Sequence, residues 1–222
     1  MKAHIETLPG GTRLYTTPDA PLTTDALLLA AFCTFRPGWA VCELGCGNGA
    51  VLLSLVDCGL RGPVVGVDCQ PQALALLEKA VADGHISNVQ AACQDLRGYK
   101  SARLFDMVLA NPPYHTSGRL AQSEARALAR HQLGATLQDF CTAAARLLKQ
   151  RGRFCLCYPA RQLAALFAAL QESGLQPKRL QLVRKTPAAA PRLALIQARK
   201  AAGPGLEILP DIVLAAAHPA AE

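Results

Sequence analysis

The chain has 222 residues, of which 51% are hydrophobic and 18% charged, so it can bury a large core and is not globally disordered. Its longest apolar run, Ala26 to Phe35, has about half the length that a bilayer requires, so no transmembrane segment is expected. Residues 1–11 are polar and acidic where a signal peptide needs an apolar stretch. Length and composition therefore predict a single-domain cytoplasmic protein with no membrane association.

Positive charge gathers in the second half of the chain. The net charge is +7, and residues 119–200 hold 15 Lys and Arg against three acids, whereas the remainder holds 8 against 13. A basic half beside a mildly acidic one indicates a polyanionic partner next to a separate small-molecule site. Solvated basic side chains on helix faces are the alternative interpretation.

Nine cysteines raise the alternatives of disulfides and a zinc site. Their number is odd, no C-x-x-C pair occurs, and several lie in apolar stretches (Cys42, Cys58, Cys141 and Cys155). We therefore expect reduced cysteines that pack as small hydrophobic side chains, and no metal. The sequence does not indicate an oligomeric state, and a monomer is compatible with it.

Strands and helices alternate along the chain. The expected strands are 39–44, 63–68, 89–93, 104–110, 153–158, 179–185 and 192–200, and the expected helices are 49–57, 72–82, 136–149 and 161–173. Thr136-Leu-Gln-Asp139 is a capping box for the third helix. This alternation predicts an α/β fold with a parallel sheet, whose ligands bind beyond the carboxyl ends of the strands. We expect one domain, with an N-terminal segment 1–38 that packs on the cofactor site, a core 39–214 and an Ala-rich tail 215–222.

A glycine-rich turn, residues 43–49 (ELGCGNG), follows the first expected strand. Glycines permit a tight turn and let a ligand approach the backbone. Gly45, Gly47 and Ala50 also satisfy a dinucleotide fingerprint, so the turn alone does not define the ligand. Glu43 favours a cationic ligand such as S-adenosylmethionine, because its carboxylate would repel the pyrophosphate of a dinucleotide.

Two further acids end the next two strands. Asp68 can accept hydrogen bonds from both ribose hydroxyls, which a nicotinamide cofactor would also require. Asp95 is positioned to meet the amino group of an adenine. Together with the glycine turn, the two acids favour S-adenosylmethionine over a dinucleotide.

Asn111-Pro112-Pro113-Tyr114 directly follows the strand 104–110. Two prolines fix the backbone and remove two N–H donors, so the turn presents acceptors, namely the Asn111 side-chain oxygen and the Pro112 carbonyl. An aromatic amine is a poor nucleophile, and two acceptors that grip its hydrogens orient the nitrogen for methylation. Tyr114 can stack on an extruded base. The alternative is an ordinary loop turn, in which Asn and Pro are common.

With these motifs the chain resembles the bacterial class I methyltransferases that form N(6)-methyladenosine beside the anticodon of a valine tRNA. The resemblance covers nearly the whole chain and rests on residues 14–15, 24–30, 43–49, 68, 95, 105–106, 111–114, 129–131, 177–180 and 205–214. It implies a Rossmann-like, mostly parallel sheet of seven strands, with helices on both faces and an antiparallel last strand.

The resemblance also implies roles for individual residues. Cofactor contacts would come from Thr24, Asp25, Glu43, Gly45, Gly47, Asn48, Asp68, Cys69, Asp95, Leu96 and Asn111. The adenine would be held by Asn111, Pro112, Pro113 and Tyr114, and the tRNA by Arg119, Arg130, His131, Lys178 and Arg179. A solvated helix end or a salt bridge stays open for Arg130 and His131.

Other functions fit parts of the same pattern. An Asn-Pro-Pro-Tyr turn serves a glutamine amide equally well, so a methyltransferase acting on a release factor is the first alternative. A DNA adenine methyltransferase is less favoured because no separate target-recognition domain is visible. A nicotinamide-dependent oxidoreductase would leave Glu43 and the Asn-Pro-Pro-Tyr turn unexplained. An RNA-binding protein without activity is disfavoured, because the cofactor motif and the acceptor motif are both intact.

Overall fold

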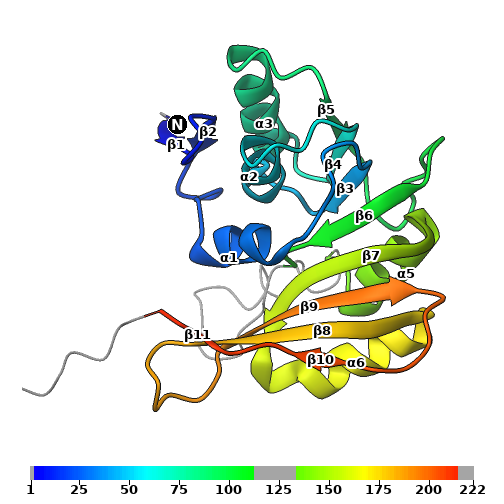
Figure 1. Cartoon of the computed structure of the whole chain (residues 1–222). Coiled ribbons are helices and arrows are strands. Elements are labelled where there is room, and N and C mark those ends of the chain that lie inside the picture. The colour runs from blue at the N-terminus through cyan, green and yellow to red at the C-terminus, as the bar shows by residue number, and fades with distance from the viewer. Residues whose placement is uncertain (1–2, 113–133, 215–222) are drawn as a thin grey trace, which may run out of the picture.

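A mostly parallel sheet lies at the centre of the molecule (Figure 1). The computed structural model describes residues 3–112 and 134–214. Within these residues the sheet has nine strands in the order β10-β8-β9-β7-β6-β3-β4-β5, and β11 also pairs with β8. The strands are β3 (Val41–Leu44), β4 (Val64–Asp68), β5 (Val89–Cys93), β6 (Phe105–Ala110), β7 (Leu148–Pro159), β8 (Leu175–Arg184), β9 (Leu193–Lys200), β10 (Glu207–Ile208) and β11 (Ile212–Val213).

The seven strands from β5 across to β8 form the expected sheet, and β9 is antiparallel to both of its neighbours. The expected number of seven is too low for the whole sheet, because β10 and β11 each add a short parallel pairing to β8. All four residues of β3 are buried, as is typical of a parallel strand that is covered on both faces.

Helices cover both faces of the sheet (Figure 1). One face carries α1 (Thr24–Phe32), α2 (Ala50–Asp57) and α3 (Pro71–Asp83), and the other carries α5 (Leu137–Leu147) and α6 (Leu163–Glu172), which follows the 3₁₀ turn η1 (Ala160–Gln162). Each face has its own hydrophobic core. Seven of the eight residues of α2 are buried, so this helix is enclosed on nearly all sides.

Two element boundaries differ from the sequence prediction. The helix expected over 136–149 begins with the predicted capping box but ends at Leu147, because Leu148 already pairs with Phe105 in the sheet. Strand β8 starts at Leu175 instead of 179. A register shift between Pro177 and Arg179 accommodates the proline, which cannot donate to the strand ladder.

The N-terminal segment contains a hairpin that the sequence analysis does not predict. Its strands β1 (His4–Thr7) and β2 (Arg13–Thr16) pair with each other, and every residue of β1 is exposed, so the segment lacks an alternating apolar pattern. Asp57 at the end of α2 anchors the hairpin turn, since its carboxylate accepts the Gly10 N–H at 2.6 Å and the Thr12 N–H at 2.9 Å. The hairpin is therefore fixed to α2 through one side chain.

All nine cysteines are free thiols, and six of them are buried. Cys58, which the apolar context of the sequence predicts to be packed, lies at the end of α2 and is exposed. Cys69 and Cys93 are also exposed. Within residues 3–112 and 134–214 no group of His, Cys, Asp and Glu is arranged to hold a metal ion. No helix in these same ranges is both long and apolar enough to span a bilayer.

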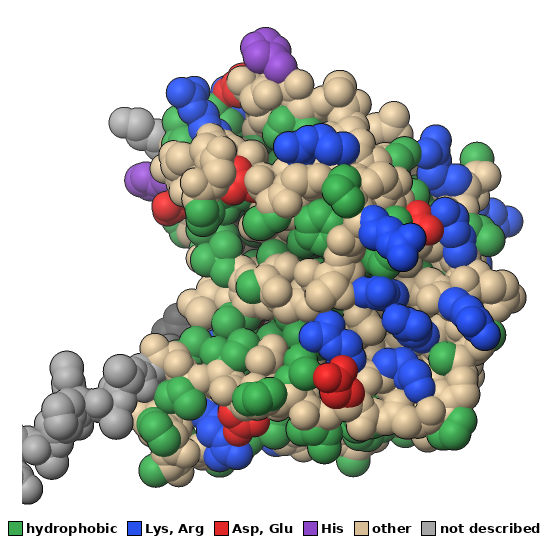
Figure 2. Space-filling model, in the orientation of Figure 1, with side chains coloured by type: hydrophobic (Ala, Val, Ile, Leu, Met, Phe, Trp, Pro, Cys, Tyr) green, Lys and Arg blue, Asp and Glu red, His purple; other side chains and the backbone are tan. Residues whose placement is uncertain are grey.

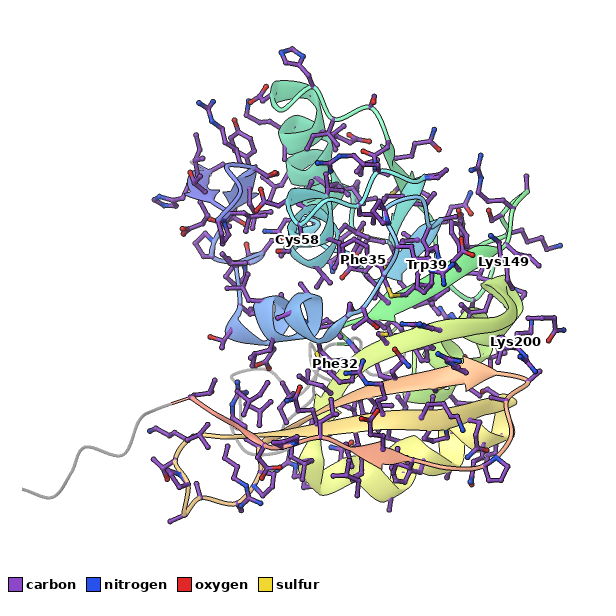
Figure 3. The ribbon with its side chains drawn as sticks, viewed as in Figure 1. Phe32, Phe35, Trp39, Cys58, Lys149 and Lys200 are labelled. Atoms are coloured by element: carbon purple, nitrogen blue, oxygen red, sulfur yellow. The ribbon has the colours of Figure 1, made fainter. Side chains whose placement is uncertain are left out.

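Basic side chains are unevenly spread over the surface. Figure 2 shows Lys and Arg gathered on the right of the molecule, where β7, β8 and β9 meet the loop that precedes β3. Lys149 and Lys200 lie at this end of the sheet and Trp39 lies near it (Figure 3). The carboxyl ends of the parallel strands β3 and β6 lie at the opposite end of the sheet (Figure 1).

Candidate active site

The glycine turn connects β3 to α2, and its glycines adopt a backbone that other residues rarely tolerate. Gly45, Gly47 and Gly49 have φ of +70°, +54° and +78°. A Cβ at Gly47 would meet nothing within 4 Å, so this position leaves open space beside the backbone. At Gly49 a Cβ would lie 2.5 Å from Leu77 Cδ1, so this glycine is also required for packing between α2 and α3.

Glu43, on β3 immediately before this turn, is 2% exposed. Burial raises the pKa of its carboxyl well above the usual range, the hydrogen bond from the Leu52 backbone opposes this, and the nearby Asp68 adds to the increase. Among the described residues nothing forms a hydrogen bond with its Oε2 atom. A buried carboxylate oxygen without a partner fits a ligand that brings a positive charge or a donor.

Asp68, at the end of β4, connects the glycine turn to the turn that follows β4. Its side chain accepts the Gly47 N–H at 2.8 Å and the Gln70 N–H at 2.9 Å, and the residue is 7% exposed. The predicted role toward ribose hydroxyls would use the remaining lone pairs of the same oxygens. Cys69 follows at an exposed position, and burial, followed by the charge of Asp68, raises its thiol pKa.

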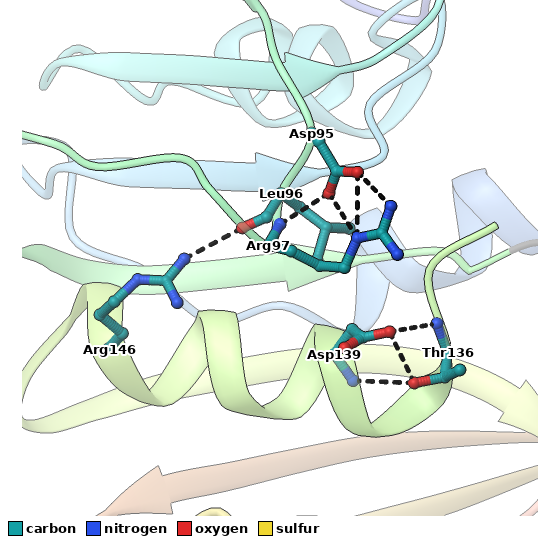
Figure 4. A network of polar contacts seen from close by, with 6 residues as sticks. All are labelled: Asp95, Leu96, Arg97, Thr136, Asp139 and Arg146. Atoms are coloured by element: carbon teal, nitrogen blue, oxygen red, sulfur yellow. Dashed lines mark hydrogen bonds and ion pairs between the residues drawn. The ribbon is translucent and has the colours of Figure 1, made fainter. Parts of the chain in front are cut away.

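Asp95 forms a contact that the sequence analysis does not predict (Figure 4). Both of its oxygens accept from the Arg97 side chain, with 3.0 Å from Nε to each, and the Arg97 N–H donates to Oδ1 at 2.8 Å. The Arg97 side chain is the main cause of the lowered pKa of Asp95. An adenine amine at Asp95 would therefore share an acceptor with Arg97.

The segment around Asp95 is fixed by α5. Arg146 donates to the Leu96 and Tyr99 carbonyls at 3.0 Å each, and Leu96 is buried (Figure 4). The loop after β5 is thereby held against the helix that follows the undescribed residues 113–133. Arg97 and Arg146 could not have been selected from the sequence, because nothing in their spacing distinguishes them from surface arginines.

The N-terminal segment lies against the glycine turn. The Asn48 side chain donates to the Tyr15 carbonyl at 3.1 Å and to the Ala20 carbonyl at 2.9 Å, so its amide hydrogens are both used within the chain. Thr24 is the first residue of α1, and Asp25 pairs with Arg192 at 2.6 Å. Asn48 and Asp25, which were predicted to contact the cofactor, thus also have partners within the chain.

Asn111 and Pro112 follow β6, which pairs directly with β3. The register sets Leu44 beside Ala110, so the glycine turn and the Asn-Pro corner begin at neighbouring positions on the same sheet edge. Asn111 is half-buried and Pro112 is buried. The predicted Pro113 and Tyr114 lie outside the described residues.

Cys157 on β7 is a further candidate site residue, which no sequence motif predicts. It is fully buried, and its Sγ lies 3.0 Å from Asn111 Oδ1. The register of β6 and β7 pairs Ala110 with Leu156, which brings the next residue of each strand together. The sequence predicts both strands, 104–110 and 153–158, but not that they pair in this register.

Of the five predicted RNA-binding residues, the structure describes two, Lys178 and Arg179. Lys178 donates all three of its ammonium hydrogens to the carbonyls of residues 203–205, at 2.9, 2.9 and 3.1 Å, which is a structural role. Arg179 lies over the Phe32 ring, with its guanidinium carbon 5.1 Å from the ring centre. Arg119, Arg130 and His131 lie outside the described residues.

Comparison with known proteins identifies the family. The methyltransferase domain family matches residues 35–190, and the chain belongs to this family. One relative is the tRNA1(Val) (adenine(37)-N6)-methyltransferase of Dickeya chrysanthemi, which is 31% identical over 68% of this chain and 61% of its own length. The tRNA1(Val) (adenine(37)-N6)-methyltransferase of Bacteroides thetaiotaomicron is 27% identical over 78% of this chain and 74% of its own length. The match thus spans less than two thirds of the Dickeya protein.

Solved methyltransferase structures share the fold. A protein of Agrobacterium tumefaciens described as a predicted O-methyltransferase aligns with a TM-score of 0.71 at 16% identity, over 89% of this chain and 91% of that one. A 16S rRNA N2 G1207 methyltransferase of T. thermophilus, solved with AdoMet and guanosine, aligns with a TM-score of 0.63 at 21% identity, over 90% of this chain and 50% of that one. The Rossmann-like class I methyltransferase fold predicted from the sequence is confirmed.

Proposed function

We propose that this protein uses S-adenosylmethionine to methylate the exocyclic amino group of an adenine in tRNA, at the position next to the anticodon of a valine tRNA. The observation that carries the proposal is the adjacency of the glycine turn and the Asn-Pro corner, which follow the paired residues Leu44 and Ala110. Methyl donor and amine acceptor would therefore meet at one sheet edge. A cytoplasmic location follows from this substrate.

The cofactor side of the site has the chemistry that S-adenosylmethionine requires. Glu43 has a buried oxygen without a partner among the described residues, suited to a cationic ligand. Gly47 leaves space beside the backbone, and Asp68 holds the N–H of that glycine, so the turn keeps its open shape. When bound, the cofactor supplies an electrophilic methyl group on a sulfonium.

The acceptor side of the site orients the amine. The Asn111 oxygen and the Pro112 carbonyl would accept the two hydrogens of the adenine amino group, turning the nitrogen lone pair toward the methyl carbon. The amine nitrogen would take the methyl group that the bound cofactor would supply, and would then release one proton to solvent. Catalysis is positional, so no strong base is required.

The choice of tRNA rests on the named relatives and on the excess of positive charge in residues 119–200. The same acceptor geometry serves a glutamine amide, so methylation of a release factor is the alternative to be tested. Membership in the methyltransferase domain family disfavours a nicotinamide-dependent oxidoreductase.

The test compares methyl transfer from labelled S-adenosylmethionine onto bulk tRNA and onto release factor, followed by mass spectrometry of the tRNA nucleosides. We expect label in N(6)-methyladenosine of tRNA alone. Asn111→Ala should abolish transfer while the Kd for the cofactor stays nearly unchanged, and Gln90→Ala, which removes an exposed amide on β5, should retain activity. Label in the release factor, or loss of cofactor affinity in Asn111→Ala, would contradict the proposal.

A further inference from the structure

Four arginines gather on the face of the sheet that α1 covers only in part. They lie on β7, β8, β9 and the loop before β3, and we call them the arginine face: Arg36, Arg153, Arg179 and Arg199. Residues 153, 155 and 157 of β7 point to the same side of the sheet. Cys155 and Cys157 pack in the core with α1, whereas Arg153 binds the Thr34 carbonyl at 2.9 Å, beyond the end of that helix. The arginine face therefore begins where the helix stops covering the sheet.

Aromatic rings hold two of these guanidinium groups in place. The guanidinium carbon of Arg153 is 4.7 Å from the centre of the Trp39 ring, and that of Arg179 is 5.1 Å from the centre of Phe32. Figure 3 labels both rings on this side of the molecule. A stacked guanidinium has fewer conformations to lose when it binds an anion, although Nη1 of Arg153 already donates to the carbonyl and the hydroxyl of Thr34.

The positive charge of this face is poorly compensated within the described residues. Burial lowers the pKa of Arg153, and the charges of Arg199, Arg179 and Arg36 lower it further. Glu207 lies 3.7 Å from Arg179, but its side chain is 64% exposed, so it screens little. Arg199 Nε is buried and has no hydrogen-bond partner in the described part of the chain. Clustered guanidinium groups with little compensating negative charge are suited to a ligand that brings several negative charges.

The arginine face lies at a defined distance from the acceptor corner. Cys157 touches Asn111, and Arg153 precedes it by four residues, which is about 13 Å at about 3.3 Å per strand residue. The strand between these two residues is buried beneath α1, so an RNA held at Asn111 must pass around that helix and spans more than this distance. A substrate held at Asn111 would reach Arg153 and Arg199 only if it extends that far.

We propose that the arginine face binds backbone phosphates of the substrate RNA at nucleotides beyond the immediate neighbours of the methylated adenine. This inference rests on the proposed function, since it assigns the surface to the same substrate. The face would select for RNA length and fold without touching the reacting base, because phosphate contacts carry no direct sequence information. It would lower KM and leave the chemical step unchanged.

The experiment uses two RNAs with the full-length protein. One is the target adenine with two nucleotides on each side, and the other is the complete anticodon stem-loop. Arg153→Gln, Arg199→Gln and the double variant should each raise KM for the stem-loop, by about five- to tenfold per arginine near 0.1 M salt, with kcat unchanged. The salt slope of stem-loop binding should fall by about 0.7–0.9 per arginine. KM for the short RNA should stay at the wild-type value.

Controls separate loss of charge from loss of structure. Arg13→Gln removes the same charge from an exposed position on β2, and Arg199→Lys keeps the charge at the proposed site. We expect both to stay close to wild type. Equal effects on the two RNAs, or no effect on the stem-loop, would overturn the inference. If the wild type methylates no RNA, the proposed function fails, and stem-loop binding without cofactor still tests the arginine face independently.

Discussion

Replacement of Glu43 by glutamine tests the cofactor site at its most buried polar residue. The side chain is 2% exposed, one oxygen has no hydrogen-bond partner in the described residues, and the Leu52 N–H binds the carboxylate. Glutamine has nearly the same volume and keeps an oxygen for Leu52, but it cannot carry the negative charge. A hydrogen bond between charged groups contributes about 1.5–3 kcal/mol, and 1.4 kcal/mol is about tenfold in affinity. The Kd for S-adenosylmethionine should therefore rise about 10- to 150-fold.

Calorimetric titration at fixed ionic strength measures this change in Kd. Glu78→Gln is the matched control, because it removes the same charge from an exposed position on α3 and should leave the Kd unchanged. Thermal unfolding of the ligand-free variant reports whether the fold is retained. A Kd within about twofold of wild type would refute the assignment of Glu43 to the cofactor, as would an equal weakening in the control.

Three further outcomes are expected. Gly49→Ala should lower the free energy of unfolding by about 2–5 kcal/mol in chemical denaturation, since a left-handed φ costs about 1–2 kcal/mol and the 2.5 Å approach to Leu77 about 1–3 more. Because burial raises the pKa of folded Glu43, the folded state binds more protons, so ligand-free stability should fall as pH rises above about 4.3, and Glu43→Gln should flatten that slope in denaturation curves across pH. Cys157→Ala should reduce kcat with little change in cofactor Kd, because the thiol that contacts Asn111 Oδ1 helps to orient it; unchanged single-turnover kinetics would exclude this role.

The sequence was sufficient to predict the parts of the fold that repeat a simple pattern. Buried strands followed by amphipathic helices predict the sheet. The glycine turn and the Asn-Pro corner both end apolar runs, which predicts that they share one end of the sheet. The hairpin over 4–16 could not be predicted in this way, since β1 has no buried face and depends on Asp57 from a distant helix.

Side-chain partners were predicted less well than backbone positions. Asp95 was expected to face a ligand and also pairs with Arg97. Lys178 was expected to contact RNA, and its ammonium group binds three carbonyls within the chain. Such partners depend on loop geometry, which no local pattern encodes. Cys157 is the reverse case, because it belongs to the site only through the register of β6 and β7.

The short strands β10 and β11 cover the outer edge of β8. Without them, the outer edge of β8 would present a row of free N–H and C=O groups ten residues long, a template for strand pairing between molecules. Two pairings of two residues each, with Pro210 between them, interrupt that row and offer in its place edges too short to propagate a sheet. Residues 207–213 thus cover backbone groups of β8 that would otherwise face a second molecule, although Ile208, at 66% exposure, contributes little to the core.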